Sequence, residues 1–288
     1  MRTVLSALSV LLAVVLTAVA VPALWLERNV TDESGFVKLL EPMGRDADLQ
    51  STLVANLDTA VLSSAGIPEA AQPLARQAIQ HVGDGLVSDP GFPQAWTETL
   101  QASHRLNFTP GVASTNAFEL ELRPVADLLA SKLGAIIGVQ LPGPRALGVQ
   151  VGTPQQRSWL TAAQDLAGLS QPLALGAALA LLLGLLFARR RGVPLAWAGL
   201  CFIVTAAVFQ VGTGIVPLFA SAQASSGSMS STFGIRAAVL AVDSFEPWIG
   251  GLALVGGVLL VTGAVLGLVR RLRRSRAAAQ GRLASMEV

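Results

Sequence analysis

Four stretches of this chain contain no Asp, Glu, Lys, Arg or His, and each is long enough to cross a lipid bilayer. They run from Val4 to Leu26, from Leu169 to Ala188, from Val193 to Val216 and from Trp248 to Val269. A span needs roughly 20 mostly apolar residues, and within the hydrocarbon only helices and closed barrels satisfy their own backbone polar groups. The sequence, 52% hydrophobic and 13% charged, therefore predicts an α-helical membrane protein with four transmembrane helices.

The arginines outside these stretches predict which way the chain crosses. Arg2 precedes the first stretch and a triplet at 189–191 separates the second from the third, while six arginines follow the fourth, at positions 270, 271, 273, 274, 276 and 282. Because Lys and Arg near span ends favour the cytoplasmic side, four crossings would place all ten there. We therefore expect cytoplasmic N- and C-termini in the cell membrane, with the triplet in the turn of a helical hairpin and Pro194 at the start of the third helix.

The expected organisation has six parts. They are transmembrane helix 1 at 1–26, an exported domain at 27–168, transmembrane helices 2 and 3 at 169–216 with a hairpin at 189–192, an exported loop at 217–247, transmembrane helix 4 at 248–269 and a basic cytoplasmic tail at 270–288. In the exported loop, mostly apolar residues around Arg236 predict a short helix at 233–242, lying against the headgroups or under the exported domain. Asp243 and Glu246 suit the N-terminal dipole of the fourth helix.

Formal charge differs between the part expected to be exported and the parts expected in the cytoplasm. Segment 27–170 holds nine basic and fifteen acidic residues, whereas the expected cytoplasmic parts hold ten basic residues and Glu287. The cluster from Arg270 to Arg276 could neutralise nucleic-acid phosphates, but the predicted topology already accounts for arginines there. We expect the lipid bilayer as a partner, with this cluster attracted to anionic headgroups, and no nucleic acid.

Two further features bear on the exported domain. The AVA at 18–20 resembles a signal-peptidase site, but the apolar run of about 23 residues exceeds the 7 to 15 of a signal core, so we expect a retained helix. Either alternative exports the segment that follows.

Cys201, the single cysteine, lies within the third span, so the chain has no intrachain disulfide and the exported domain must rely on its own core.

Apolar periodicity predicts a mainly helical, α+β exported domain. Helical spacing occurs in a short segment ended by Pro42, at 47–63 behind the N-cap Asp46, after Pro73 and after Pro93. A further helix is expected from 154 toward the second span, preceded by a capping box at Thr153, Pro154 and Gln156 and interrupted near Pro172.

Between these helical segments the period changes to that of strands. Apolar residues alternate with polar ones at Phe118, Leu120 and Leu122, and apolar residues alternate again at Leu147, Val149 and Val151. A helical pattern at 125–136 separates the two. This is a small β-α-β element, whose strands could pair in parallel through the helix.

Three runs of the sequence carry a resemblance to known proteins. WLERNVTDESGFVKLLEPMGRDADLQSTLVANL, FPQAWTETLQASHRL and FELELRPVADLLASKLG resemble an actinobacterial family of four-span integral membrane proteins with an exported domain after the first helix. The resemblance implies the same four-span fold. Its motifs are structural, so it implies no activity, cofactor or site residue.

Residues that could carry chemistry are few. His81 and His104, the two histidines, lie 23 residues apart without a metal-binding motif such as HExxH. His104 shares a helical stripe with apolar residues, which favours a satisfied histidine at the edge of a core over a general base. Glu119 and Glu121 share one face of the predicted strand, where alternating charge is ordinary, although with His104 they could suggest acid/base chemistry. The sequence thus nominates no catalytic, cofactor-binding or metal-ligating residue.

The spans predict packing rather than transport. Ionisable residues inside membrane spans often mark the path of an ion or substrate, and the four predicted spans contain no Asp, Glu, Lys, Arg or His. Gln210 is the main polar side chain within them, and we expect it to hydrogen-bond another helix. Small residues recur at Gly176, Ala180, Gly184 and Ala188, at Ser9, Ala13 and Thr17, and at Gly263 and Gly267. Such stripes permit close approach of helices, which fits a four-helix bundle, homodimerisation or both.

We therefore expect a non-enzymatic integral membrane protein of the cell envelope, whose exported domain binds or organises another envelope component. Two alternatives stay open. One is an envelope enzyme with a site in the exported domain, motivated by His104, Glu119 and Glu121. The other is an accessory subunit of a transport or secretion complex, which would co-purify with a multispan partner.

Overall fold

The chain folds mainly into helices that form two compact units. The computed structural model describes residues 2–54, 73, 77, 81, 85, 89–109, 118–138, 147–151, 154–188, 192–222 and 229–284. A bundle unit comprises Met1–Trp25, Gly168–Thr213 and Phe245–Val288, and a head unit comprises Leu26–Ala167 and Gly214–Ser244. Four helices are long and apolar enough to cross a membrane, so the prediction of four such helices is confirmed.

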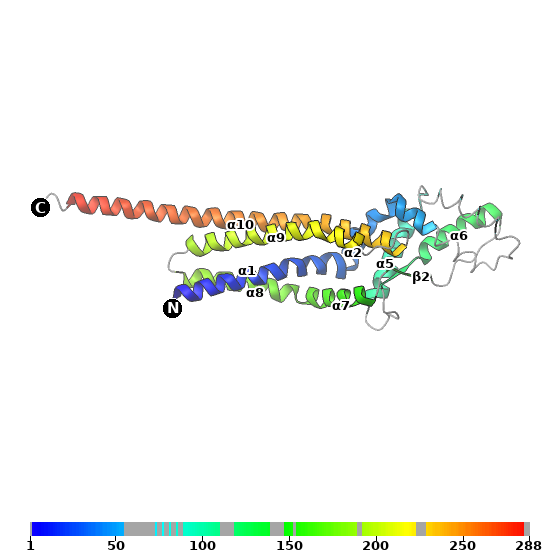
Figure 1. Cartoon of the computed structure of the whole chain (residues 1–288), viewed down its shortest axis with the longest axis horizontal. Coiled ribbons are helices and arrows are strands. Elements are labelled where there is room, and N and C mark those ends of the chain that lie inside the picture. Colours follow the sequence, from blue (N-terminus) through cyan, green and yellow to red (C-terminus); the bar gives the residue numbers. More distant parts are fainter. Residues whose placement is uncertain are drawn as a thin grey trace. The chain divides into compact units, whose positions relative to one another are not determined.

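The bundle unit is built from parts of four helices. These are α1 (Arg2–Leu26), α8 (Ser170–Phe187), α9 (Gly192–Ala222) and α10 (Met229–Ala284), and Figure 1 shows α1 beside α8 and α9 beside α10. The Ser6 hydroxyl of α1 donates to the carbonyl of Gly184 in α8 at 2.7 Å. A Cβ at Gly184 would lie 2.8 Å from a methyl of Val10, so the predicted small-residue stripe of α8 is in close contact. On α1, Ser6, Val10 and Ala13 are buried while Ser9 is only partly so.

Helices α9 and α10 make the closest backbone approach in the described bundle. A Cβ at Gly199 would collide with the carbonyl oxygen of Gly256, and a Cβ at Gly263 would lie 2.5 Å from the backbone nitrogen of Ala196. Only glycine allows these distances, because any larger side chain would separate the helices. Gly263 therefore has its predicted packing role. Gly199 and Gly256 were not singled out, since neither belongs to a GxxxG pair.

The prediction for Gln210 is wrong within the described structure. Gln210 is exposed on α9, and its backbone carbonyl accepts a hydrogen bond from the Thr213 hydroxyl at 2.9 Å. At 1.5 Å per residue, Gln210 lies about 27 Å along the helix from Gly192. Gln210 is therefore close to the far end of the predicted third span, which ends at Val216.

The described residues of the segment expected as a loop at 217–247 are helical. Helix α9 continues through Pro217 to Ala222, and α10 runs unbroken from Met229 through Pro247 to Ala284, as the single ribbon in Figure 1 shows. A helix at 233–242 does exist, but it is the beginning of α10 rather than a separate element. Proline removes one backbone N–H, which membrane helices tolerate when neighbouring groups satisfy the freed carbonyl. Asp243 and Glu246 therefore lie inside a helix, and they are exposed.

The first part of the head unit follows directly from α1. A π-helix at Glu27–Thr31 leads to α2 (Glu33–Leu40), which continues as a 3-10 helix at Glu41–Arg45. Asp32 caps α2 by accepting the Gly35 N–H at 2.9 Å. The predicted N-cap Asp46 accepts the Leu49 N–H at 3.0 Å, and residues 47–54 are helical; the remainder of the helix predicted at 47–63 lies outside the described residues.

Helix α5 (Phe92–Phe108) is the centre of the head unit and begins at Phe92, one residue before the expected start at Pro93. Trp96 is 1% exposed, and its indole N–H donates to the Leu40 carbonyl at 3.2 Å. A Cβ at Gly44 would lie 2.7 Å from the Trp96 ring. The helix therefore joins the α2 segment to the strands, which it also contacts.

The strands pair antiparallel, so the suggested parallel arrangement is wrong. β1 (Glu119–Glu121) pairs with β2 (Gly148–Gln150), with Leu120 opposite Val149, and α6 (Arg123–Ile137) lies between them in sequence. The Leu122 N–H donates to the Leu147 carbonyl at 2.8 Å, so the chain returns to the end of β1 from which it left. Alternation of apolar residues identifies a strand's faces but carries no information about its direction.

The other edge of β1 is satisfied by α5. The Asn107 amide donates to the Glu119 carbonyl at 2.6 Å and accepts the Glu119 N–H at 3.0 Å. The Ser103 hydroxyl accepts the Glu121 N–H at 2.8 Å. Two polar side chains thus replace a third strand, which explains how so small a sheet remains ordered, since two strands alone are marginal.

The start of α10 belongs to the core of the head unit. Phe233 is buried there, 6.2 Å from Phe118 between ring centroids. Arg236 forms ion pairs with Asp46 at 2.8 Å and Asp48 at 3.1 Å. Of the two predicted positions for this segment, packing beneath the predicted exported domain is the one that these contacts favour.

Helix α7 (Pro154–Gly168) ends one residue before α8, with Leu169 as the interruption and Pro172 in the first turn of α8. Several sequence predictions lie outside the described residues. These are Thr153 of the capping box, the turn at 189–191, and most of the helix expected after Pro73, of which Pro73, Gln77, His81 and Gly85 are helical.

Gly35 offers a test of the head unit's packing. A Cβ at this position would collide with the backbone carbonyl oxygen of Arg28, so Gly35→Ala should lower the free energy of unfolding by about 1–3 kcal/mol. Gly234→Ala is the matched control, because its Cβ meets nothing within 4 Å and alanine favours helix by up to about 1 kcal/mol. Thermal unfolding of the detergent-solubilised full chain would separate them, and equal melting temperatures would contradict this packing.

Candidate functional site

His104, the candidate general base, is held in the core of the head unit. It is 7% exposed, its Nε2 lies 3.0 Å from the Thr31 carbonyl oxygen, and its ring stacks on Phe108 with 4.4 Å between centroids. Phe36 lies beside it at 5.2 Å. Through these contacts His104 packs α5 against the π-helix. A histidine buried in this way does not support the hypothesis of acid/base chemistry.

The Glu121 side chain accepts hydrogen bonds from backbone N–H groups where β1, α6 and the chain entering β2 meet. Its carboxylate oxygen Oε1 accepts the N–H of Arg123 at 3.2 Å and the N–H of Leu147 at 3.0 Å. It therefore joins the end of β1 to the start of α6 and to the chain entering β2. Glu119 lies on the same face, with its carboxylate beside Gly148. The strand alternation placed both side chains correctly, but their contacts are structural.

The second histidine and the other acidic groups do not add a metal site. His81 is helical and exposed. Across the residues that the structure describes, no three His, Cys, Asp or Glu side chains gather closely enough to hold a metal ion.

Two carboxylates of the head unit have perturbed pKa values. The Ser34 hydroxyl, at 2.5 Å, and then the Gly35 N–H lower the pKa of Asp32. Hydrogen bonding from Lys132, then from the Gly91 N–H at 2.8 Å, lowers the pKa of Asp89. Because a lowered pKa means that the folded state favours the charged form, these contacts stabilise the head unit above the carboxyl's unfolded pKa of about 3.9 and lose their effect as the pH falls through the folded value.

A shallow depression on the head unit gathers charged side chains. It has a volume of about 380 Å³ and is lined by Glu98, Ala102, Glu121, Arg123, Pro124 and Asp127. Arg123 pairs with Asp127 at 3.5 Å, and both are largely exposed. Exposed pairs of this kind contribute little to stability, so the depression is a polar surface with an excess of carboxylates that is open to a partner.

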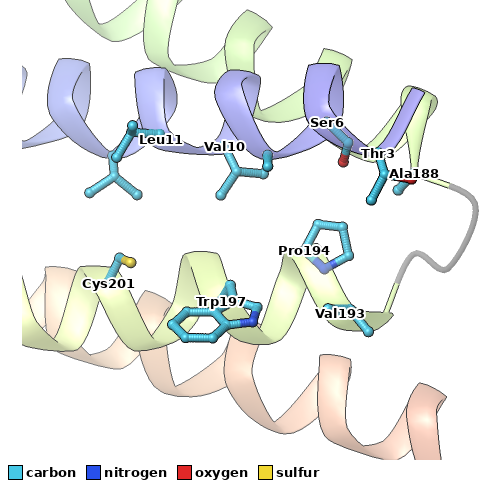
Figure 2. Close-up of a pocket in the computed structure, with 11 residues that line it drawn as sticks. Thr3, Ser6, Val10, Leu11, Ala188, Val193, Pro194, Trp197 and Cys201 are labelled. Atoms are coloured by element: carbon cyan, nitrogen blue, oxygen red, sulfur yellow. The ribbon is translucent and has the colours of Figure 1, made fainter. Parts of the chain in front are cut away.

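A larger apolar groove lies in the bundle unit between α1 and α9. Its volume is about 670 Å³, and Figure 2 shows side chains of the two helices facing each other across it. Val10 and Leu11 line the α1 side and Trp197 and Cys201 the α9 side. At one end lie Thr3 and Ser6, which bring hydroxyl groups to the described lining, and the Ser6 hydroxyl donates to the Gly184 carbonyl.

The groove can hold an apolar chain or a helix, but it offers no reactive pair. Its lining comes from residues 3–14, 188 and 193–201, which are far apart in sequence. No sequence motif predicts this groove, because each residue of its lining, taken alone, is of a type common in membrane helices. Cys201 was recognised only as the single cysteine, and its place in the groove became evident from the structure.

Comparison with known proteins adds no further identification: no protein family, curated protein or solved structure matches the chain. The resemblance to an actinobacterial four-span family stays a prediction, and function must be argued from the residues described above.

A structural role for His104 and Glu121 predicts a specific effect of removing them. His104→Ala loses a buried stacking and hydrogen-bonding group, and Glu121→Ala leaves two backbone N–H groups without their acceptor; each should cost about 1–3 kcal/mol of unfolding free energy. Glu41→Ala, at an exposed helical position, should change it by less than about 0.5 kcal/mol. Unfolding of the full chain, followed by near-UV circular dichroism, measures all three. Unchanged stability together with a loss of turnover on an envelope substrate would contradict the structural role.

Proposed function

We propose that this chain is a non-enzymatic multi-pass protein of the cell membrane, whose head unit is exported and binds or organises another component of the cell envelope. Cytoplasmic N- and C-termini follow if the positive-inside tendency governs the ten arginines at the predicted span ends. The predicted spans contain no Asp, Glu, Lys, Arg or His, which argues against an ion-coupled carrier.

The observation that carries this proposal is the dual role of α10. Its first turns contribute Phe233 and Arg236 to the head unit, and its later turns contribute Gly256 and Gly263 to the contact with α9. The same helix, α10, therefore contributes residues to both units, so a component bound to the head unit would be held by a chain that also enters the bundle unit.

The acidic depression is the binding surface that we assign to the head unit. Its three carboxylates exceed its single guanidinium, and segment 27–170 as a whole is acidic. A partner that presents basic groups would complement this surface, and such complementarity mainly increases association rate and specificity. Glu98 is the most useful probe because it is exposed and lies on α5.

Charge reversal tests this assignment. We expect the full chain, purified in mild detergent from its native host, to retain a stoichiometric envelope partner. Glu98→Lys should reduce its recovery about tenfold, equivalent to roughly 1.4 kcal/mol, whereas Glu41→Lys, a reversal at an exposed position outside the depression, should retain it. Mass spectrometry quantifies the partner. Equal recovery with both variants, or a purified chain that binds nothing and turns over an envelope substrate, would contradict the proposal.

A second candidate function, an accessory subunit of a transport or secretion complex, is favoured by the groove between α1 and α9. A helix of a multispan partner could pack there, whereas our leading proposal expects lipid chains. Because Cys201 is the single cysteine and lines this groove, a benzophenone maleimide attached to its thiol in native membranes should crosslink lipid only. A crosslinked multispan protein, absent with Cys201→Ser, would favour the accessory subunit instead.

A further inference from the structure

A second groove of the bundle unit joins an apolar floor to two cationic side chains. It lies between α9 and α10, has a volume of about 470 Å³ and includes Arg270 and Arg271 in its lining. Its volume is within the range of about 300–1,000 Å³ that is typical of ligand sites. The groove therefore differs from the one between α1 and α9, whose described lining contains no charged residue.

The close approach of α9 and α10 creates the floor of this groove. Gly192 and Gly263 are in backbone contact, so little side chain separates the helices there. Gly267 lines the groove one turn later, and a Cβ at this position would meet nothing within 4 Å. The open space above Gly267 is thus available to an acyl chain lying against the two helices.

The charged residues lie where a lipid headgroup would be. Val269 ends the uncharged stretch of α10, and Arg270 and Arg271 follow it and are exposed. Trp197 also lines this groove and is 61% exposed, and tryptophan favours the level of the headgroups. Guanidinium groups bind phosphate through paired charge-assisted hydrogen bonds. An anionic phospholipid matches this order of groups, with phosphate at the arginines and hydrocarbon over the glycine floor.

We propose that the groove between α9 and α10 binds one anionic phospholipid, with its phosphate on Arg270 and Arg271 and an acyl chain over Gly267. The proposal rests on the membrane placement in the proposed function, but it is independent of the head unit's partner. It goes beyond general attraction between a basic tail and a membrane, because it requires one lipid, one groove and two particular arginines.

Native mass spectrometry of the detergent-purified full chain can count bound lipids. On titration with phosphatidylglycerol and with phosphatidylcholine, the wild-type chain should bind one phosphatidylglycerol at least tenfold more tightly than phosphatidylcholine. Arg270→Gln with Arg271→Gln should remove this preference, while leaving phosphatidylcholine binding unchanged. Gly267→Leu, which fills the groove without changing charge, should weaken phosphatidylglycerol binding at least tenfold.

Two control variants separate a site from diffuse attraction. The double variant Arg273→Gln and Arg274→Gln removes the same formal charge from positions that follow Arg270 and Arg271 in sequence, and Gly257→Leu adds the same volume at a position where a Cβ meets nothing within 4 Å. Both should retain the phosphatidylglycerol preference. Equal losses in test and control variants, the absence of a one-lipid complex, or a dimer of the chain that Gly267→Leu dissociates would each overturn the proposal. Failure of the head unit to bind a partner would leave these lipid measurements unaffected.

Discussion

The bilayer interior excludes unpaired charge and unsatisfied backbone groups, and most of this structure depends on that constraint. Four uncharged stretches become helices because a helix satisfies its own backbone. Since lipid tails are as apolar as the helices, packing between them relies on close contact and hydrogen bonds rather than on the hydrophobic effect. The contacts of Gly199 with Gly256, and of Ser6 with Gly184, are of this kind.

The head unit obeys a different constraint, because water competes for its polar groups and it has no disulfide. Its core forms around Trp96, and buried polar side chains complete hydrogen bonds that a two-stranded sheet leaves open. An unpaired buried N–H or carbonyl costs about as much as a lost hydrogen bond. Asn107 and Glu121 are therefore structural residues, and their polarity is explained without assigning them a reaction.

Much of the fold was predictable, and the errors share a physical cause. Apolar periodicity and caps located α5, α6 and the four apolar helices, because burial and local hydrogen bonds depend on nearby sequence. The direction of β2 and the packing of the first turns of α10 in the head unit depend on contacts distant in sequence, such as those of Leu122 with Leu147 and of Phe233 with Phe118. The expected exported loop begins at Pro217 and ends at Pro247, whereas both prolines lie inside helices.

The candidate sites were less predictable than the fold. The two grooves flank α9 and share Val193 and Trp197, but the side opposite α9 comes from residues 3–14 in one groove and from residues 263–271 in the other. Arg270 and Arg271 were recognised as part of a basic cluster, and their position in a groove could not be deduced from the cluster. The acidic depression likewise combines residues of α5 with residues around β1 and α6.

The central claim is that the head unit lies on the side of the membrane opposite the ten terminal and hairpin arginines. In a Cys201→Ser background, single cysteines at Ser131 in the head unit and at Ser275 in the basic tail can be labelled on intact cells with a membrane-impermeant maleimide. We predict that Ser131→Cys is labelled on intact cells and that Ser275→Cys is labelled only after lysis. Labelling of Ser275→Cys on intact cells, with Ser131→Cys protected until lysis, would contradict the account.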